Sequence, residues 1–169
     1  MTIDIPTPGT YKLDASKTSL TFNAKHMFGL ATVTGTFTLD SGEITVADPV
    51  ADSSVVAGAL AASFASGNPT RDKHIRSAQF LNAEQSPQIT FRSTQLQNEN
   101  DQWVLQGQLT AAGATAPTQF RILEVRSQGD TLEIRATATI DRYAHEMTKK
   151  KGLAGQFINL EMNAIAVKP

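Results

Sequence analysis

The stretch of residues 19–39, SLTFNAKHMFGLATVTGTFTL, contains two runs in which apolar and polar residues alternate. The apolar positions are Leu20, Phe22, Ala24 and His26 in the first run and Ala31, Val33, Gly35, Phe37 and Leu39 in the second. Successive side chains of a strand point to opposite faces, so this period of two indicates two half-buried strands. The connection between them, residues 27–30, is unusually apolar.

The same alternation recurs along most of the chain. Further runs cover residues 11–13, 43–46, 53–64, 89–93, 103–110, 118–123, 132–140 and 158–166. Ser41-Gly42 predicts a turn before residue 43, and Pro6, Pro8 and Gly9 predict a loose leader. Short strands without intervening helices predict an all-β, antiparallel sandwich or barrel of about eight strands. Residues 1–169 are expected to form a single domain.

Residues 68–94, NPTRDKHIRSAQFLNAEQSPQITFRST, interrupt this pattern with a charged helical insertion. Thr70 is expected to cap a short helix, and Asp72 suits its first turn because the helix dipole favours a negative charge there. Pro87 ends the irregular part, and alternation resumes at Ile89. One helix in an all-β chain is a natural place to look for function.

Composition excludes several classes of protein. The 15 basic residues nearly cancel the 16 acidic ones, so no broad positive field attracts nucleic acid. No cysteine is present, which excludes disulfides and thiolate sites. The N-terminus has no signal-peptide pattern, and no run of apolar residues is long enough to cross a bilayer. A cytoplasmic protein without integral membrane association is therefore expected. The residues are compatible with a homodimer without predicting one.

Composition alone leaves open whether the barrel is packed or hollow. The faces expected to point inward carry small residues, among them Ala24, Gly35, Gly58, Ala62, Gly107, Ala136, Ala138 and Ala164. Small and large residues alternate in packed barrels, but glycine and alanine also leave space for an apolar ligand. In residues 53–64 the inward face is not fixed, because both faces carry small residues.

Three histidines and their neighbours are the candidates for chemistry. His26, on an apolar face, suits either a hydrogen-bonded core histidine or a ligand contact at the barrel mouth. Asp72 is close enough in sequence to orient Arg71 or His74, although a solvated helix start explains it as well. No spacing of His26, His74 and His145 supports a metal site, and no nucleophile or phosphate motif is present. No cofactor is predicted.

Four motifs together resemble the YceI-like family of lipocalin-like barrels. They are Tyr11-x-x-Asp14 with residues 19–22, residues 25–27 and Val33-x-Gly35-x-Phe37; residues 71–77 with Phe80 and 87–93; residues 107–110 with Gly113 and Pro117; and Ile140-Asp141-Arg142. The resemblance implies an antiparallel barrel with a short helical insertion. Its interior is expected to hold a long-chain amphiphile, characteristically a polyisoprenoid, without catalysis. Where the family often has Phe-Gly after the last motif, this chain has Ala144-His145.

The resemblance gives the polar and apolar candidates a shared role. His26, Arg71, Asp72, His74 and Arg142 are expected to hold the ligand's polar head. The tail is expected to lie against Phe22, Phe28, Phe37, Ile75, Phe80, Phe91, Leu109, Phe120 and Leu160. Burial of the tail at about 25 cal/mol per Å² supplies most of the affinity, and the head sets orientation.

Three functions therefore compete. The leading hypothesis is binding, carriage or sequestration of a polyisoprenoid or isoprenoid quinone. The second is an enzyme that acts on a small apolar substrate with His26 or His74 as general base, which requires the two histidines to lie near each other in a cleft. The third is a stress-related structural barrel without ligand, which requires a lumen below roughly 300 Å³.

Overall fold

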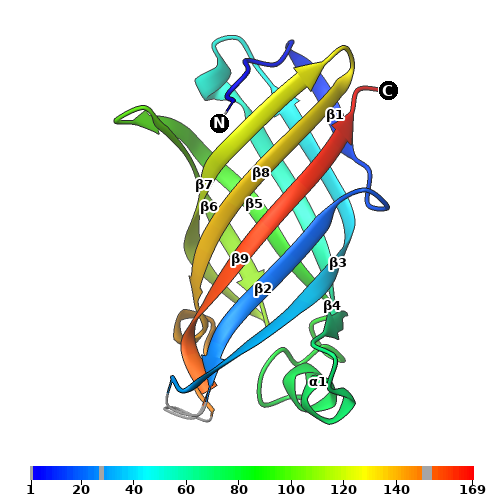
Figure 1. Cartoon of the computed structure of the whole chain (residues 1–169), viewed down its shortest axis with the longest axis vertical. Coiled ribbons are helices and arrows are strands. Elements are labelled where there is room, and N and C mark those ends of the chain that lie inside the picture. The colour runs from blue at the N-terminus through cyan, green and yellow to red at the C-terminus, as the bar shows by residue number, and fades with distance from the viewer. Residues whose placement is uncertain (1, 27–28, 150–153) are drawn as a thin grey trace.

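The computed structural model describes residues 2–26, 29–149 and 154–169, and at His26 and Ala154 it describes the backbone alone. This part of the chain forms nine antiparallel strands, one α-helix and two short 3-10 turns (Figure 1). The strands are β1 (Gly9–Leu13), β2 (Ser19–His26), β3 (Ala31–Val46), β4 (Ser54–Ala65), β5 (Gln88–Glu99), β6 (Gln102–Ala111), β7 (Ala114–Gln128), β8 (Thr131–Asp141) and β9 (Ala154–Val167). The helix is α1 (Pro69–Arg76), and the 3-10 turns are η1 (Val50–Asp52) and η2 (Arg142–His145).

Strands β2 to β9 close into an antiparallel barrel. Each strand pairs with the next along the chain, and β2 also pairs with β9, which completes the circle. Strand β1 is extra: it pairs with β3 and β9 beyond the start of β2, so β1 and β2 together make one interrupted position in the wall. The predicted barrel of about eight strands is confirmed.

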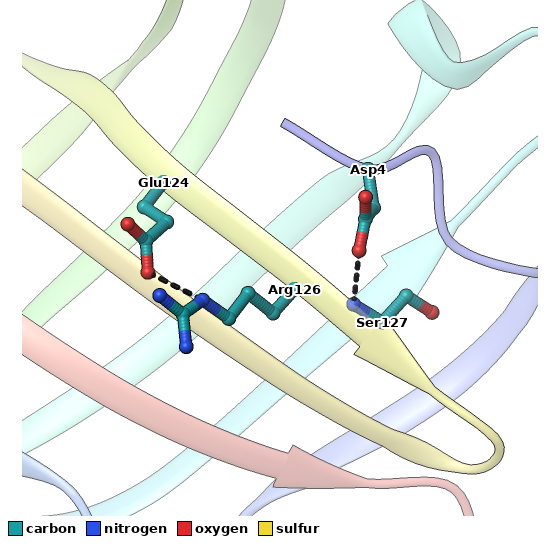
Figure 2. A network of polar contacts seen from close by, with 4 residues as sticks. All are labelled: Asp4, Glu124, Arg126 and Ser127. Atoms are coloured by element: carbon teal, nitrogen blue, oxygen red, sulfur yellow. Dashed lines mark hydrogen bonds and ion pairs between the residues drawn. The ribbon is translucent and has the colours of Figure 1, made fainter. Parts of the chain in front are cut away.

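The two ends of the barrel differ. At one end, here called the α1 end, helix α1 lies next to the end of β4 (Figure 1). At the other end, the leader end, lie both termini, and the leader is the segment of residues 2–8 (Figure 1). The leader is not loose: Ile3 forms a parallel bridge to Val125 of β7, and Asp4 accepts a hydrogen bond from the Ser127 amide at 2.9 Å (Figure 2). A surface ion pair, Arg126 with Glu124, lies next to it on the same strand (Figure 2).

The predicted turn at Ser41-Gly42 is wrong, because β3 continues through it to Val46. Only a register shift against β4, between Leu39 and Ser41, marks the place. A Cβ atom added to Gly42 would lie 1.9 Å from Cδ1 of Leu13 in β1. The glycine therefore permits close packing of β1 on β3, and a strand glycine often has this role.

The sequence left open which face of β4 points inward. The structure shows that it is the face with Val55, Ala57 and Ala59. Val55, Ala57 and Ala59 line the interior, whereas Val56 and Leu60 are 42% and 38% exposed. The expectation that Ala62 points inward is therefore wrong, whereas Gly58 is buried and lines the middle cavity. Further along, the residues from Leu60 to Ala65 oppose only Thr38 to Thr36, and this bulge shifts the inward parity so that Phe64 is buried.

Gly35 and Gly107 face the interior as predicted, but they do not leave empty space. A Cβ atom at Gly35 would lie 2.5 Å from the Phe22 ring, and one at Gly107 would lie 2.5 Å from the Phe91 ring. Each glycine accommodates an aromatic ring from the neighbouring strand. The open volume of the barrel therefore lies elsewhere.

Helix α1 is short and ends at Arg76. Its N-cap is Asn68, whose side-chain oxygen accepts a hydrogen bond from the Arg71 amide at 3.1 Å. The predicted cap at Thr70 is wrong, because Pro69 begins the helix as its first residue and the cap therefore lies two positions earlier, at Asn68.

Candidate functional site

Three cavities lie in series inside the barrel. Their volumes are about 260 Å³ at the α1 end, 100 Å³ in the middle and 140 Å³ at the leader end. The first two share the walls Phe37, Leu81, Met147 and Ile158. The middle and leader-end cavities share Ala57, Phe91, Phe120 and Met162. The barrel therefore encloses a segmented apolar lumen along its length.

The α1-end cavity is aromatic on one side and cationic on the other. Phe22 stacks on Phe64 with ring centroids 4.7 Å apart, and Phe37 meets the same ring edge-on at 5.4 Å. Arg71 and His74 come from α1, and Arg142 comes from η2. Among the described residues that line this cavity, none carries a carboxylate.

His74 has a polar atom without a hydrogen-bond partner. Its Nε2 is buried and makes no hydrogen bond to any described residue, while its ring contacts Phe80 edge-on with centroids 5.2 Å apart. An unsatisfied buried polar atom costs about 1–3 kcal/mol. A ligand that brings a complementary polar atom to this position would recover that cost.

Asp72 has a structural role. Its carboxylate accepts two hydrogen bonds to Oδ1, from the Ser66 hydroxyl at 2.6 Å and from the Ser66 amide at 3.0 Å. The Ser66 hydroxyl in turn accepts one from Nε of Arg71 at 3.0 Å. These bonds, the Ser66 hydroxyl first among them, hold the pKa of the Asp72 carboxyl below its ordinary value. Asp72 does not line the cavity; it acts through Ser66 to position Arg71.

Arg142 is buried and bridges chain segments. Its Nε donates to the Gly155 carbonyl at 2.7 Å, and its Nη1 donates to the Met147 carbonyl. Its guanidinium lies over the rings of Phe80 and Tyr143, at 5.5 and 4.9 Å from their centroids. Burial lowers the pKa of this arginine from its ordinary value. The guanidinium thus joins η2 to β9 as well as forming one wall of the cavity.

His145 has a packing role in the structure. It is 2% exposed, and its Nε2 lies 2.9 Å from the Leu109 carbonyl, with Nδ1 3.4 Å from that of Asp141. It therefore fixes η2 against β6. In the sequence, this position stands out only because Ala144-His145 replaces the Phe-Gly pair that the family often has.

Most of the predicted tail contacts line the lumen. Those on the walls of the cavities are Phe22, Phe37, Ile75, Phe80, Phe91, Leu109, Phe120 and Leu160. Phe28 and the side chain of His26 lie outside the described residues. Of the predicted head-group residues, the structure brings Arg71, His74 and Arg142 together on one cavity. Contact with a ligand stays a prediction for all of them.

Sequence reasoning missed the contribution of the leader. Ile3, Ile5 and Pro6 line the leader-end cavity, where Trp103 of β6 and Val125 of β7 also lie. The alternation of Ile3 and Ile5 was the signal available, but the prolines beside it indicated a loop.

No helix among the described residues is long and apolar enough to cross a membrane. Those residues also contain no group of three or more metal-ligating side chains.

Comparison with known sequences identifies related proteins. The family model described as the YceI-like domain matches residues 11–166. A UPF0312 protein of Pectobacterium atrosepticum is 35% identical over 96 residues, which are 53% of this chain and 50% of that protein. Protein YceI of Salmonella arizonae is 45% identical over 60 residues, 36% of this chain and 31% of its own. The matches thus span half or less of these curated relatives.

Solved structures share the fold at low sequence identity. BcnA of Burkholderia cenocepacia superposes with a TM-score of 0.81 at 18% identity, over 92% of this chain and 99% of that one. A polyisoprenoid-binding domain from Saccharophagus degradans superposes with a TM-score of 0.72 at 14% identity, over 94% of this chain and 98% of that one. At these identities the likeness concerns the barrel alone.

Proposed function

Because the chain belongs to the YceI-like domain family, we propose that it binds a long-chain amphiphilic lipid, of the polyisoprenoid or isoprenoid-quinone kind, in its barrel lumen. The observation that carries the proposal is the series of three largely apolar cavities, with an imidazole nitrogen at one end that has no hydrogen-bond partner among the described residues. Ligand pockets combine this kind of apolar lining with a few polar anchors. The structural neighbour from Saccharophagus degradans is itself a polyisoprenoid-binding domain, which supports the ligand class.

The polar head would lie at the α1 end, between His74 and Arg71. His74 offers the unpartnered Nε2, and Arg71 retains guanidinium donors beyond the Nε–H that bonds Ser66. Arg142 contributes a cationic wall, and His26 stays a predicted contact. Asp72 is assigned to positioning through Ser66 rather than to direct contact, because it is absent from the cavity wall.

Binding fits the site better than catalysis does. His74 lies against Phe80 and makes no hydrogen bond to a carboxylate or hydroxyl among the described residues, so nothing there orients it as a general base. A packed barrel without ligand fits less well, because the three cavities together exceed the roughly 300 Å³ at which ligand pockets begin. Carriage or sequestration of the lipid, cytoplasmic location and homodimer formation stay predictions.

Narrowing the lumen tests the proposal. Ala57 lies on the wall shared by the middle and leader-end cavities, so Ala57→Leu would place three further carbons in the path of the tail. Each methylene of the tail that can no longer be buried costs about 0.8 kcal/mol, so excluding two weakens binding about tenfold. We expect that loss in titrations of delipidated protein with geranylgeraniol and with a short-chain ubiquinone.

Ala62→Leu is the matched control, since Ala62 is exposed on the same strand. It should bind both probes as the unsubstituted protein does. Equal affinity for Ala57→Leu and Ala62→Leu would place the ligand outside the lumen. If neither probe binds the unsubstituted protein, the proposed lipid class is wrong.

A further inference from the structure

The leader follows a fixed path across one end of the barrel. The Asp4 amide donates to the Val125 carbonyl at 2.9 Å, and the Val125 amide donates to the Thr2 carbonyl at 2.8 Å. The Asp4 carboxylate accepts from the Ser127 amide, as Figure 2 shows. Further along, the Tyr11 hydroxyl donates to the Thr7 carbonyl at 2.7 Å. The leader is thus attached at both its beginning and its end.

Beneath the leader lies the 140 Å³ cavity, whose surface is almost wholly apolar although three lining residues, Asp4, Ser53 and Trp103, carry polar side-chain atoms. Asp4 and Ser53 accept hydrogen bonds from the backbone amides of Ser127 and Ala47, each at 2.9 Å. The polar atoms of the three side chains contribute almost nothing to the surface of the cavity. A guest with a polar group at this position would lose its hydration without an evident replacement, which is costly.

This cavity is also the last in the series. It adjoins the middle cavity through Ala57, Phe91, Phe120 and Met162, and Phe91 meets Phe120 edge-on with centroids 5.1 Å apart. On its far side, Ile3 packs with the buried cluster of Tyr11, Val125 and Leu132. A tail that extends from the α1 end along the lumen therefore meets Ile3 and its neighbours in the leader.

We propose that the leader-end cavity is a separate tail-end compartment, which receives the last hydrocarbon segment of the ligand and is closed by Ile3 to Pro6. The inference rests on the proposed function and adds a specificity to it. The ligand carries its polar group at one end only, and the distance from His74 to Ile3 sets the length of tail that binds best. Longer tails, and tails with a second polar group at the far end, bind less well.

Prenyl alcohols of increasing length test this compartment. Delipidated protein is titrated with geraniol, farnesol, geranylgeraniol and geranylfarnesol, and affinity should rise with length to an optimum and then fall. The analogue of the best-binding alcohol that carries a hydroxyl at the far end of its tail should bind roughly tenfold more weakly, because that hydroxyl is buried without a partner. Equal affinity of the two would overturn the proposal.

Two substitutions locate the effect. Ala164 lines this cavity and neither of the others, so Ala164→Leu should weaken the best-binding alcohol about tenfold and leave the next shorter one within about twofold. Ile3→Ala should move the optimum toward a longer alcohol. Ala62→Leu, on the outer surface of β4, is the control and should change nothing, and thermal melts of all three variants verify folding.

The outcomes separate this inference from the function on which it rests. If the alcohols bind but Ala164→Leu weakens all lengths equally, or none, the compartment does not receive the tail and only the inference fails. If no alcohol binds the unsubstituted protein, the proposed function fails, and the tail-end compartment fails with it.

Discussion

His74 holds an imidazole nitrogen inside an apolar cavity without a partner among the described residues, a state that destabilises the ligand-free protein. His145 of η2, at the same end of the barrel, shows the opposite arrangement, with both ring nitrogens near backbone carbonyls. The sequence alone does not separate these two histidines, because each lies in a polar stretch of similar composition. Their different surroundings are fixed by the packing of α1 and η2.

His74→Phe should weaken ligand binding and stabilise the ligand-free protein. The phenyl ring keeps the edge contact with Phe80 and removes the unpartnered nitrogen, so the free energy of unfolding of ligand-free protein should rise by about 1 kcal/mol. Affinity for geranylgeraniol should fall, while affinity for a hydrocarbon of the same length without the hydroxyl should stay unchanged. Denaturant unfolding and titration measure the two effects.

The same substitution at His145 is the control. His145→Phe removes the contact with the Leu109 carbonyl and should lower the free energy of unfolding by about 1–3 kcal/mol. Equal destabilisation of both variants would show that His74 has a structural partner. An equal loss of affinity for the two probes in His74→Phe would remove His74 from head-group recognition.

Helix α1 is attached to the end of β4 through hydrogen bonds. Asp72 accepts hydrogen bonds from Ser66, directly after β4, and Arg76 donates from Nε to the Phe64 carbonyl at 3.1 Å. The sequence predicted the helix and a favourable position for Asp72 near its start. The hydrogen-bond partner of Asp72 could not be predicted, because Ser66 precedes the helix and the sequence spacing does not indicate that the two side chains meet.

The Asp72 carboxylate should make the docking of α1 depend on pH. Because its folded-state pKa is lowered, the carboxylate stabilises the fold above its unfolded value of about 3.9, and this contribution is lost as the pH falls through the lower folded value. Asp72→Asn should therefore melt at a lower temperature than the unsubstituted protein near neutral pH, and the gap should narrow in acid. Thermal melts across this range measure the gap.

Asp130→Asn, in the exposed turn between β7 and β8, is the comparison, since surface substitutions change stability by only about 0.5 kcal/mol or less. It should show little gap at any pH. A gap for Asp72→Asn that stays constant from neutral to acid pH would contradict the role assigned to the carboxylate.

Alternation predicted the strands well and their irregularities poorly. Residues 19–26 and 31–39 form the strands expected of them, because a strict period of two has only one regular interpretation. The prediction failed at Ser41-Gly42 and along β4, where a close strand contact and a bulge decide the outcome. Both features depend on neighbours distant in sequence, such as Leu13, and local pattern does not contain them.

At the scale of the whole molecule, closure of the barrel follows from strand number and order, but the shape of its interior does not. Interiors are close-packed, so a few ångströms in the position of a ring decide between a filled and an open lumen. Here Gly35 and Gly107 accommodate aromatic rings, while the three cavities lie at the two ends of the barrel and in its middle. The sequence predicted which residues line the lumen better than how much of it is empty.

The central claim is that this lumen holds one amphiphilic lipid, and native mass spectrometry of the freshly purified chain tests it most directly. We predict a species in which one apolar molecule is bound per chain, and delipidated protein that takes up one molecule of geranylgeraniol or of a short-chain ubiquinone. A spectrum with only the mass of the bare chain, together with no uptake of either lipid by the delipidated protein, would contradict the claim.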